Sequence, residues 1–271
     1  MCITFSSCFY LIKSKFEPST YIEWMNNFIS IVNNFYLIIY TDENSFKYIN
    51  TNNNTKIKII IKPINTFYNY KYKNAWIKNH SNNNLINQKS LYKTSWELNM
   101  LWSEKIWFVK ESKENNYFNT TWFGWCDIGY FRNEFNDLNT KYLNNWPDFN
   151  KISQINKNLI IYSCINNNTE YIKLLFNNIK NKNKFGLPNL PIPPDQNSIA
   201  GGFFILDKDK IDWWCQIYNS KLELYFKHNY LVKDDQVIIV DCIFSNFKHF
   251  NLYYENNINY NNWFMFQRIL N

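Results

Sequence analysis

An aspartate directly after an aromatic run is the residue of this sequence best placed to do chemistry. Asp127 follows the apolar segment 122–126 and precedes Gly129 and Arg132. A carboxylate at the end of a strand can bind Mg²⁺ or Mn²⁺, and an arginine beside it can bind phosphate oxygens. The segment therefore predicts a diphosphate site, with Asp127 as metal ligand and with Gly129 and Arg132 beside the phosphates. The alternative is an ordinary strand-ending turn, in which the glycine serves only the backbone.

Two consecutive glycines mark a second candidate binding segment. Gly201 and Gly202 lie within the apolar segment 199–206, in a chain that has only five glycines. Glycine weakens the interior of a strand unless another group must approach the backbone closely, and a bound sugar ring is such a group. We therefore predict that both glycines contact a bound ligand that carries a sugar. A β-bulge or close packing of a helix is the alternative explanation.

Two adjacent aspartates supply the candidate catalytic groups. Asp234 and Asp235 precede the apolar segment 237–244. A carboxylate can take a proton from an acceptor hydroxyl or bind sugar hydroxyls. Adjacent side chains on a helix point in different directions, so only one of the two is expected to face the site. The competing interpretation is capping of a helix N-terminus, a position that aspartate favours.

Lys105 is a further candidate for the donor site. It lies beside Glu104 on the helix predicted over 85–110, from which it could reach a nucleotide. A solvated, charged helix face is the alternative for both residues. The three histidines have no partner at the spacing of a metal site or a catalytic triad. Only His249, which follows an apolar helix, could turn back toward the metal.

The elements that must position these residues alternate between strands and helices. Apolar runs rich in β-branched and aromatic residues predict strands, and apolar residues at helical spacing predict helices between them. The strands are expected within 2–13, 35–40, 57–61, 122–125, 159–162 and 199–206, the helices over 21–32, 85–110, 169–180, 208–227 and 237–244, and loops at 50–55, 79–84 and 184–197. This alternation predicts an α/β fold with a mostly parallel central sheet flanked by helices. Open α/β sheets bind ligands at the carboxyl ends of their strands, where Asp127 would lie.

Charge and cysteine content narrow the setting of the protein. The net charge of +7 favours a phosphate-bearing ligand, although the abundance of Asn and Lys suggests an AT-rich genome that accounts for part of it. The six cysteines are scattered without a CxxC pair, so a reducing compartment fits best. No basic leader and no run of eighteen apolar residues occurs. We expect no transmembrane segment and a cytoplasmic location, the host cytoplasm if the gene is viral.

Five segments, taken together and in order, resemble the HtrL/YibB-type family of glycosyltransferases, which is related to bacterial WlaTC-like enzymes and has viral members. The segments are 37–42, 98–105, 123–129, 199–204 and 234–236. The resemblance implies a GT-A, Rossmann-like fold, a nucleotide-sugar donor such as a UDP-sugar, a glycan or protein acceptor, and Mn²⁺ or Mg²⁺. It also places Asp127 at an acid of the DxD motif. Gly129 stands where that motif has its second Asp, so a cation would rely on diphosphate oxygens, water or a distant side chain.

The expected domain organisation is simple. A chain of 271 residues with 46% hydrophobic and 20% aromatic side chains can bury one large core. We predict a single domain over 1–271, with 1–132 as the nucleotide-sugar-binding half and 133–271 as the acceptor-binding half.

Two other classes of protein remain open on the sequence. The missing second Asp also fits a catalytically inactive GT-A fold that serves as a binding module. The segment 67–73 interleaves aromatic and basic residues, a pattern that can stack bases and contact phosphates. Codon bias explains that segment more simply, and no nucleic-acid partner is expected.

Overall fold

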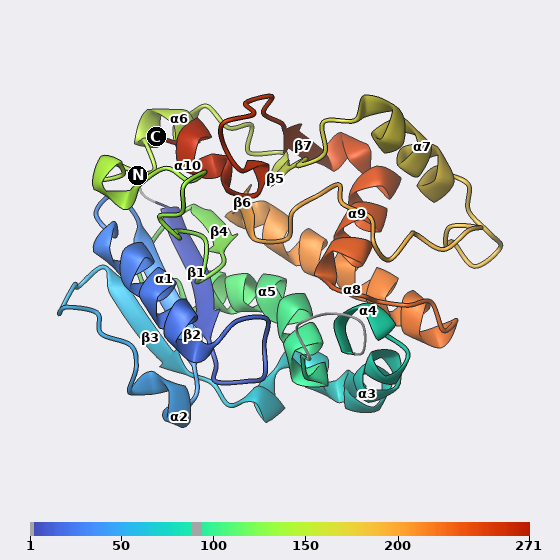
Figure 1. Ribbon diagram of the computed structural model, residues 1–271, viewed down its shortest axis with the longest axis horizontal. Coiled ribbons are helices and arrows are strands. Elements are labelled where there is room, and N and C mark those ends of the chain that lie inside the picture. Colours follow the sequence, from blue (N-terminus) through green and yellow to red (C-terminus); the bar gives the residue numbers. More distant parts are fainter. Residues whose placement is uncertain (1–2, 88–93) are drawn as a thin grey trace.

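A seven-stranded mixed sheet forms the centre of the computed structural model, which describes residues 3–87 and 94–271 (Figure 1). Its strands are β1 Ile3–Phe9, β2 Tyr36–Thr41, β3 Ile57–Ile61, β4 Trp122–Cys126, β5 Ile160–Ser163, β6 Phe203–Asp207 and β7 Phe250–Tyr253. Their order across the sheet is β3-β2-β1-β4-β6-β5-β7. Only β6 runs antiparallel to its neighbours β4 and β5, and the other pairs are parallel. The predicted α/β fold with a mostly parallel sheet is confirmed.

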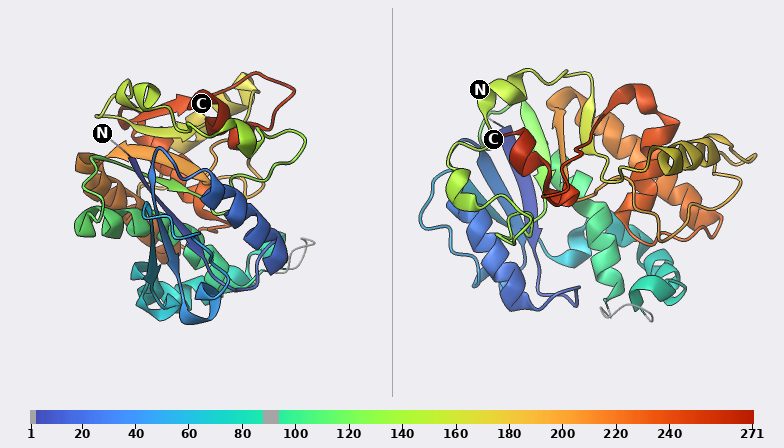
Figure 2. Two further views of the ribbon diagram at one scale, coloured as in Figure 1. Left: turned by 90° about the vertical axis from the view of Figure 1, so that its left-hand side faces the viewer. Right: turned by 45° about the horizontal axis from the view of Figure 1, so that its top comes forward.

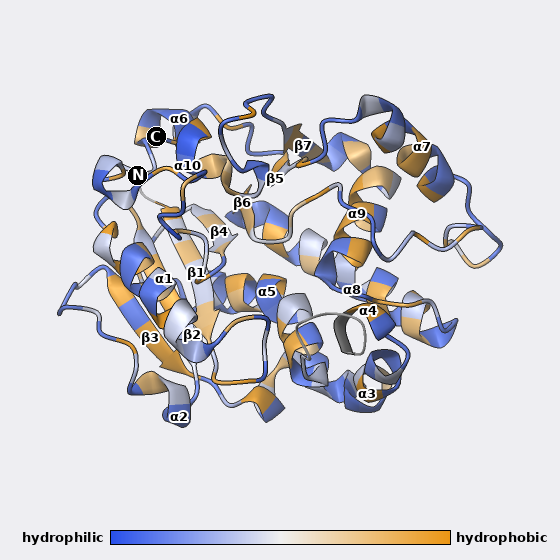
Figure 3. Ribbon diagram, viewed as in Figure 1, coloured by the Kyte–Doolittle hydropathy of each residue, from blue (hydrophilic) through white to orange (hydrophobic). Residues whose placement is uncertain are grey.

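Helices cover both faces of the sheet (Figure 2, left). Their bounds are α1 Pro18–Ser30, α2 Glu43–Phe46, α3 Lys73–Ser81, α4 Asn84–Asn87, α5 Trp96–Asn115, α6 Phe149–Ser153, α7 Thr169–Lys180, α8 Ile211–Lys227, α9 Asp235–Ser245 and α10 Phe266–Ile269. One face packs against α5, α7, α8 and α9, and the other against α1 and the C-terminal segment with α10. Figure 3 shows hydrophobic segments on the central strands and mainly hydrophilic outer loops.

Burial on both faces explains why the central strands are continuously apolar. In β2, Ile38 and Tyr40 belong to the core cluster under α5, whereas Leu37 and Ile39 belong to the cluster under α1. Successive side chains of a strand point to opposite faces, and a parallel sheet covered on both sides therefore needs apolar residues at every position. This is the pattern that predicted the strand.

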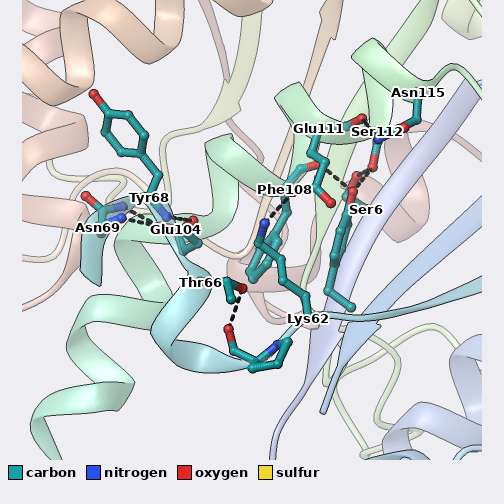
Figure 4. A network of polar contacts seen from close by, with 12 residues as sticks. Ser6, Lys62, Thr66, Tyr68, Asn69, Glu104, Phe108, Glu111, Ser112 and Asn115 are labelled. Atoms are coloured by element: carbon teal, nitrogen blue, oxygen red, sulfur yellow. Dashed lines mark hydrogen bonds and ion pairs between the residues drawn. The ribbon is translucent and has the colours of Figure 1, made fainter. Parts of the chain in front are cut away.

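Helix α5 is fixed to the 3₁₀ segment Tyr68–Tyr72 and to β1 by buried polar contacts (Figure 4). The Glu104 carboxylate accepts hydrogen bonds from the backbone N–H of Tyr68 at 2.7 Å, from that of Asn69 at 2.9 Å and from the Asn69 amide at 2.8 Å. Two turns further along, Ser112 Oγ lies 2.8 Å from Ser6 Oγ of β1. These contacts set the rotation of α5, and with it the direction of Lys105.

Replacement of Glu104 by alanine is expected to lower the free energy of unfolding by about 2–4 kcal/mol, because three buried donors would lose their acceptor. Burial raises the pKa of Glu104 from its ordinary value of 4.5 to about 7, so the wild type loses stability as the pH rises through this range, and the loss on substitution should be larger below pH 4.5 than above pH 7. The matched control is Glu111→Ala on the same helix. Glu111 forms a partly exposed ion pair with Lys62 at 2.5 Å, whose removal should cost less than about 1 kcal/mol. Equal losses in urea unfolding would contradict the assignment.

Three predicted elements differ from the structure. The helix expected over 85–110 begins at Trp96 as α5 and ends at Asn115, after the separate short helix α4, and its expected part at 88–93 lies outside the described residues. The predicted loop at 79–84 begins inside α3, which the sequence did not indicate because its apolar residues lack helical spacing. The predicted strand at 199–206 is reduced to β6, and β7 was not predicted.

None of the described helices combines the length and apolar character needed to cross a bilayer. Of the six cysteines, the five at positions 8, 126, 164, 215 and 242 are free thiols.

Candidate active site

A cavity of about 390 Å³ opens where β1 and β4 end and β6 begins. Helix α5, near the centre of Figure 1, contacts the other elements that border the cavity, β1, β4 and α9. All eight residues proposed from the sequence line it: Lys105, Asp127, Gly129, Arg132, Gly201, Gly202, Asp234 and Asp235. Lys105 and Asp235 are more than a hundred residues apart in the sequence, and the fold brings all eight residues to one cavity.

Lys105 is the electrostatic centre of the cavity. Its Nζ lies 3.0 Å from Asp127 Oδ1 and 3.1 Å from Asp235 Oδ2, and it donates a hydrogen bond of 2.9 Å to the carbonyl oxygen of Gly201. The side chain is 7% exposed. Burial alone would lower the pKa of Lys105, but the two carboxylates outweigh it and raise the pKa above its ordinary value. The alternative of a solvated helix face is therefore wrong for Lys105, and also for Glu104, which is buried.

Asp127 occupies the predicted position at the carboxyl end of β4. Its backbone N–H donates to the Gly202 carbonyl at 2.9 Å, and its carbonyl accepts from Tyr130 N–H at 2.9 Å, so it does begin a turn. Its Oδ1 also accepts a hydrogen bond of 2.5 Å from the indole of Trp125. The Asp127 side chain is 41% exposed and faces the cavity. The strand-ending turn is therefore present, and it leaves the Asp127 side chain facing the cavity.

The two adjacent aspartates have different surroundings. Asp234 caps α9, because its Oδ1 accepts from Gln236 N–H at 3.2 Å, and its Oδ2 pairs with Lys233 at 2.9 Å. Asp235 points toward Lys105 instead. Burial raises the pKa of Asp235 to about 6, although the Lys105 ammonium opposes this shift. The protonation of Asp235 therefore changes near pH 6.

The two consecutive glycines make room for these carboxylates. A Cβ atom on Gly201 would lie 2.5 Å from Asp235 Oδ2, and one on Gly202 would lie 3.2 Å from Asp127 Oδ2. Both residues precede β6, which starts at Phe203, so the prediction that they interrupt a strand is wrong. The close approach that the glycines permit involves side chains of the protein itself.

Replacement of Gly201 by alanine is expected to push Asp235 away from Lys105. Such overpacking of a buried position also costs about 1–3 kcal/mol of stability. Gly202→Ala is the matched control, because its nearest neighbour is the half-exposed Asp127 side chain, which can move. Urea unfolding measures the loss of stability, and equal losses for the two variants would contradict this role of Gly201.

Arg132 and Gly129 lie at one wall of the cavity. Arg132 Nε donates to the Gly129 carbonyl at 3.0 Å, and the guanidinium lies 4.1 Å from the centre of the Trp24 ring and 4.8 Å from that of Phe264. A Cβ atom on Gly129 would lie 2.6 Å from the Trp24 ring. Gly129 is therefore required by close packing of an aromatic ring rather than by an unusual backbone angle.

Several lining residues were not predicted from the sequence. Lys15 lies in the segment between β1 and α1, with its Nζ 4.9 Å from the centre of the Trp102 ring. Trp102 on α5 and Trp263 near the C-terminus also line the cavity. The sequence does indicate Trp102, because it lies one helical turn before Lys105 and therefore on the same face of the helix. Lys15 lies in an irregular segment and Trp263 in a single 3₁₀ turn, Asn262–Phe264, and no periodic pattern identifies either residue.

Other reactive side chains do not serve this site. The histidines are absent from the cavity lining, and His249 instead lies 4.5 Å from Trp213, ring centre to ring centre. Cys8 lines the cavity. Burial raises the pKa of the Cys8 thiol far above its ordinary value, so it remains protonated and is a poor nucleophile.

The carboxylates of the cavity do not form a ready-made site for Mn²⁺ or Mg²⁺. Across residues 3–87 and 94–271, no three His, Cys, Asp or Glu side chains come close enough to hold a metal ion. Lys105 already contacts the carboxylates of Asp127 and Asp235. A cation at about 2.1 Å from those oxygens, the distance that Mg²⁺ requires, would be repelled by the ammonium. This donor set therefore does not fit a metal held by protein ligands, and a metal role for Asp127 stays a prediction.

Comparison with known proteins gives little further information. No known family profile matches the chain, and no curated protein matches its sequence. Among solved structures, it is similar to the apo form of mouse xyloside xylosyltransferase 1, with a TM-score of 0.45 and 11% sequence identity. The match covers 92% of this chain and 85% of that one. A likeness at this level carries no argument about function, which must come from the cavity.

Proposed function

We propose that this chain is a GT-A-type glycosyltransferase that moves a sugar from a nucleotide-sugar, most simply a UDP-sugar, to a glycan or protein acceptor. The observation that carries the proposal is the convergence of the eight candidate residues in one cavity at the carboxyl ends of β1 and β4. This is the edge at which open α/β sheets bind nucleotides and related ligands. The cavity combines positive side chains, carboxylates and aromatic walls, which suit phosphates, hydroxyls and ring faces respectively.

In the proposed reaction, Asp235 is the proton acceptor. The oxygen of the acceptor hydroxyl forms a bond to the anomeric carbon of the donor sugar while its proton passes to the Asp235 carboxylate. The bond between that carbon and the diphosphate oxygen breaks, and its electron pair leaves with the nucleoside diphosphate. A base with a pKa near the working pH is effective in such a step, and the value of about 6 for Asp235 satisfies this condition.

The positive side chains have a separate role in the proposal. Lys105, Lys15 and Arg132 line the cavity and would stabilise the negative charge that grows on the departing diphosphate. Charges that are already in place before the reaction need no reorganisation during it, which makes them effective in catalysis.

A thermal-shift screen of UDP-, GDP- and CMP-sugars tests this proposal. A ligand present at a hundred times its Kd should stabilise the protein by about 2.7 kcal/mol, because it binds the folded state only. At least one nucleotide-sugar is expected to raise the melting temperature, and release of the free nucleotide should follow over time. The absence of a shift with every donor, with and without Mn²⁺, would contradict the proposal.

An inactive binding module is the second candidate, favoured by the lack of a three-ligand metal site among the described residues. It predicts a thermal shift without any transfer or donor hydrolysis. The nucleic-acid alternative has less support, because Phe67 is buried and Tyr68 stacks on Trp107 with ring centres 3.4 Å apart. These rings already pack within the protein.

A further inference from the structure

We propose that this chain binds the diphosphate of its donor without a divalent cation, with the positive charge supplied by Lys15 and Arg132 while Lys105 neutralises the carboxylates of Asp127 and Asp235. The inference rests on the proposed glycosyltransferase function and specifies how the donor is held. It starts from the mismatch between the cavity's carboxylates and a metal site.

The Lys105 ammonium lies where a cation bound by these carboxylates would have to be. Its Nζ lies 3.0 and 3.4 Å from the two carboxylate oxygens of Asp127, 3.1 Å from Asp235 Oδ2 and 2.9 Å from the Gly201 carbonyl oxygen. The group is also buried and held on α5, whose rotation is set by Glu104. Lys105 is thus a fixed charge between the two carboxylates.

The other two cations of the cavity are not neutralised by carboxylates. Among the described residues, neither Lys15 nor Arg132 forms an ion pair, and each lies over an aromatic ring, Trp102 and Trp24 respectively. Asp234, by contrast, is paired with Lys233 at 2.9 Å. Two unpaired positive charges therefore remain to meet a diphosphate. Together, these two positive charges equal the charge of one divalent cation.

The charges around Lys15 also favour binding of an anion at this position. Burial lowers the pKa of Lys15, and the positive charges of Lys233 and Lys105 add to this effect, whereas Asp234 and Asp235 oppose it. A bound phosphate would favour the charged form of Lys15. Arg132 is held in place by its hydrogen bond to the Gly129 carbonyl. Both side chains are therefore positioned to bind an anion.

Calorimetric titration of the full chain with UDP, once in EDTA and once in Mn²⁺, tests the inference. The Kd in EDTA is expected to lie within threefold of the Kd in Mn²⁺. Binding of UDP that is detectable only in Mn²⁺ would overturn the inference and leave the proposed function standing. Absence of UDP, GDP and CDP binding under both conditions would overturn the proposed function and the inference with it.

Two variants test whether the named cations take the place of the metal. Lys15→Met and Arg132→Met are each expected to weaken UDP binding in EDTA at least tenfold, as removal of a charge-assisted hydrogen bond does. Lys13→Met is the matched control, because Lys13 belongs to the same segment but is exposed and does not line the cavity. Melting temperatures show that each variant is folded. Unchanged UDP affinity in both folded cavity variants would overturn the inference.

Discussion

Replacement of Lys105 by methionine is expected to weaken nucleotide binding by about 100-fold and to lower the free energy of unfolding by about 3–5 kcal/mol. Methionine lacks the ammonium, whose nitrogen lies 3.0 Å from Asp127 and 3.1 Å from Asp235 in the wild type, so both carboxylates would lose this partner. Removal of one partner from a buried ion pair leaves an uncompensated charge, which is the reason for the large loss of stability. The two carboxylates would also repel a diphosphate.

Urea unfolding and titration with UDP measure the two effects separately. The matched control is Lys110→Met on the same helix, where Lys110 pairs at the surface with Asp212 at 2.5 Å. Its loss should cost less than about 1 kcal/mol and leave UDP binding intact. If Lys105→Met does not fold, Lys105→Arg retains the charge and allows the titration. Wild-type UDP affinity in a folded Lys105→Met protein would show that Lys105 does not bind the donor.

Replacement of Asp235 by asparagine is expected to slow sugar transfer by 10²- to 10⁴-fold, the usual contribution of a general base. Burial raises the pKa of Asp235 to about 6, and only the deprotonated form can accept a proton. The wild-type rate should therefore fall as the pH drops below about 6 and level off above it. In Asp235→Asn this dependence should disappear, whereas a merely structural role would lower the rate without removing it.

The matched control for this prediction is Asp234→Asn. Asparagine also caps helices well, so α9 should persist, and the rate should stay within a few-fold of the wild-type value because Asp234 is already engaged with Gln236 and Lys233. The rate is measured as release of nucleoside diphosphate at saturating donor. A wild-type pH profile in Asp235→Asn, or an equal loss of rate in the two variants, would exclude Asp235 as the base.

The parts of the fold that could be predicted are those whose ends carry a local signal. The helix predicted over 169–180 coincides with α7, which starts after Asn168, whose side chain accepts from Tyr171 N–H at 3.0 Å. The strand predicted over 57–61 coincides with β3, which is followed by Pro63. Caps and prolines act within a few residues, so the sequence alone reveals them.

The buried charges could not be predicted in the same way. Eleven residues of α5 are buried, among them Glu104, Lys105 and Ser103. A helix enclosed on most sides loses the contrast between an apolar and a polar face, so the rule that charged positions are exposed fails there. Local rules fail most often at functional sites, where a polar group is buried for a purpose. The start of β6 was misjudged for a related reason, since the nearby Asp235 carboxylate is distant in sequence.

The adjacency of Glu104 and Lys105 has a consequence for the interpretation of genetic variation in this chain. One residue joins two parts of the fold and the next carries the charge of the cavity, so substitutions at either position should reduce the amount of folded protein in a cell. A selection based on activity alone would then score unfolding and loss of chemistry as the same event. Only a parallel measurement of protein abundance can distinguish variants that do not fold from folded variants that have lost activity.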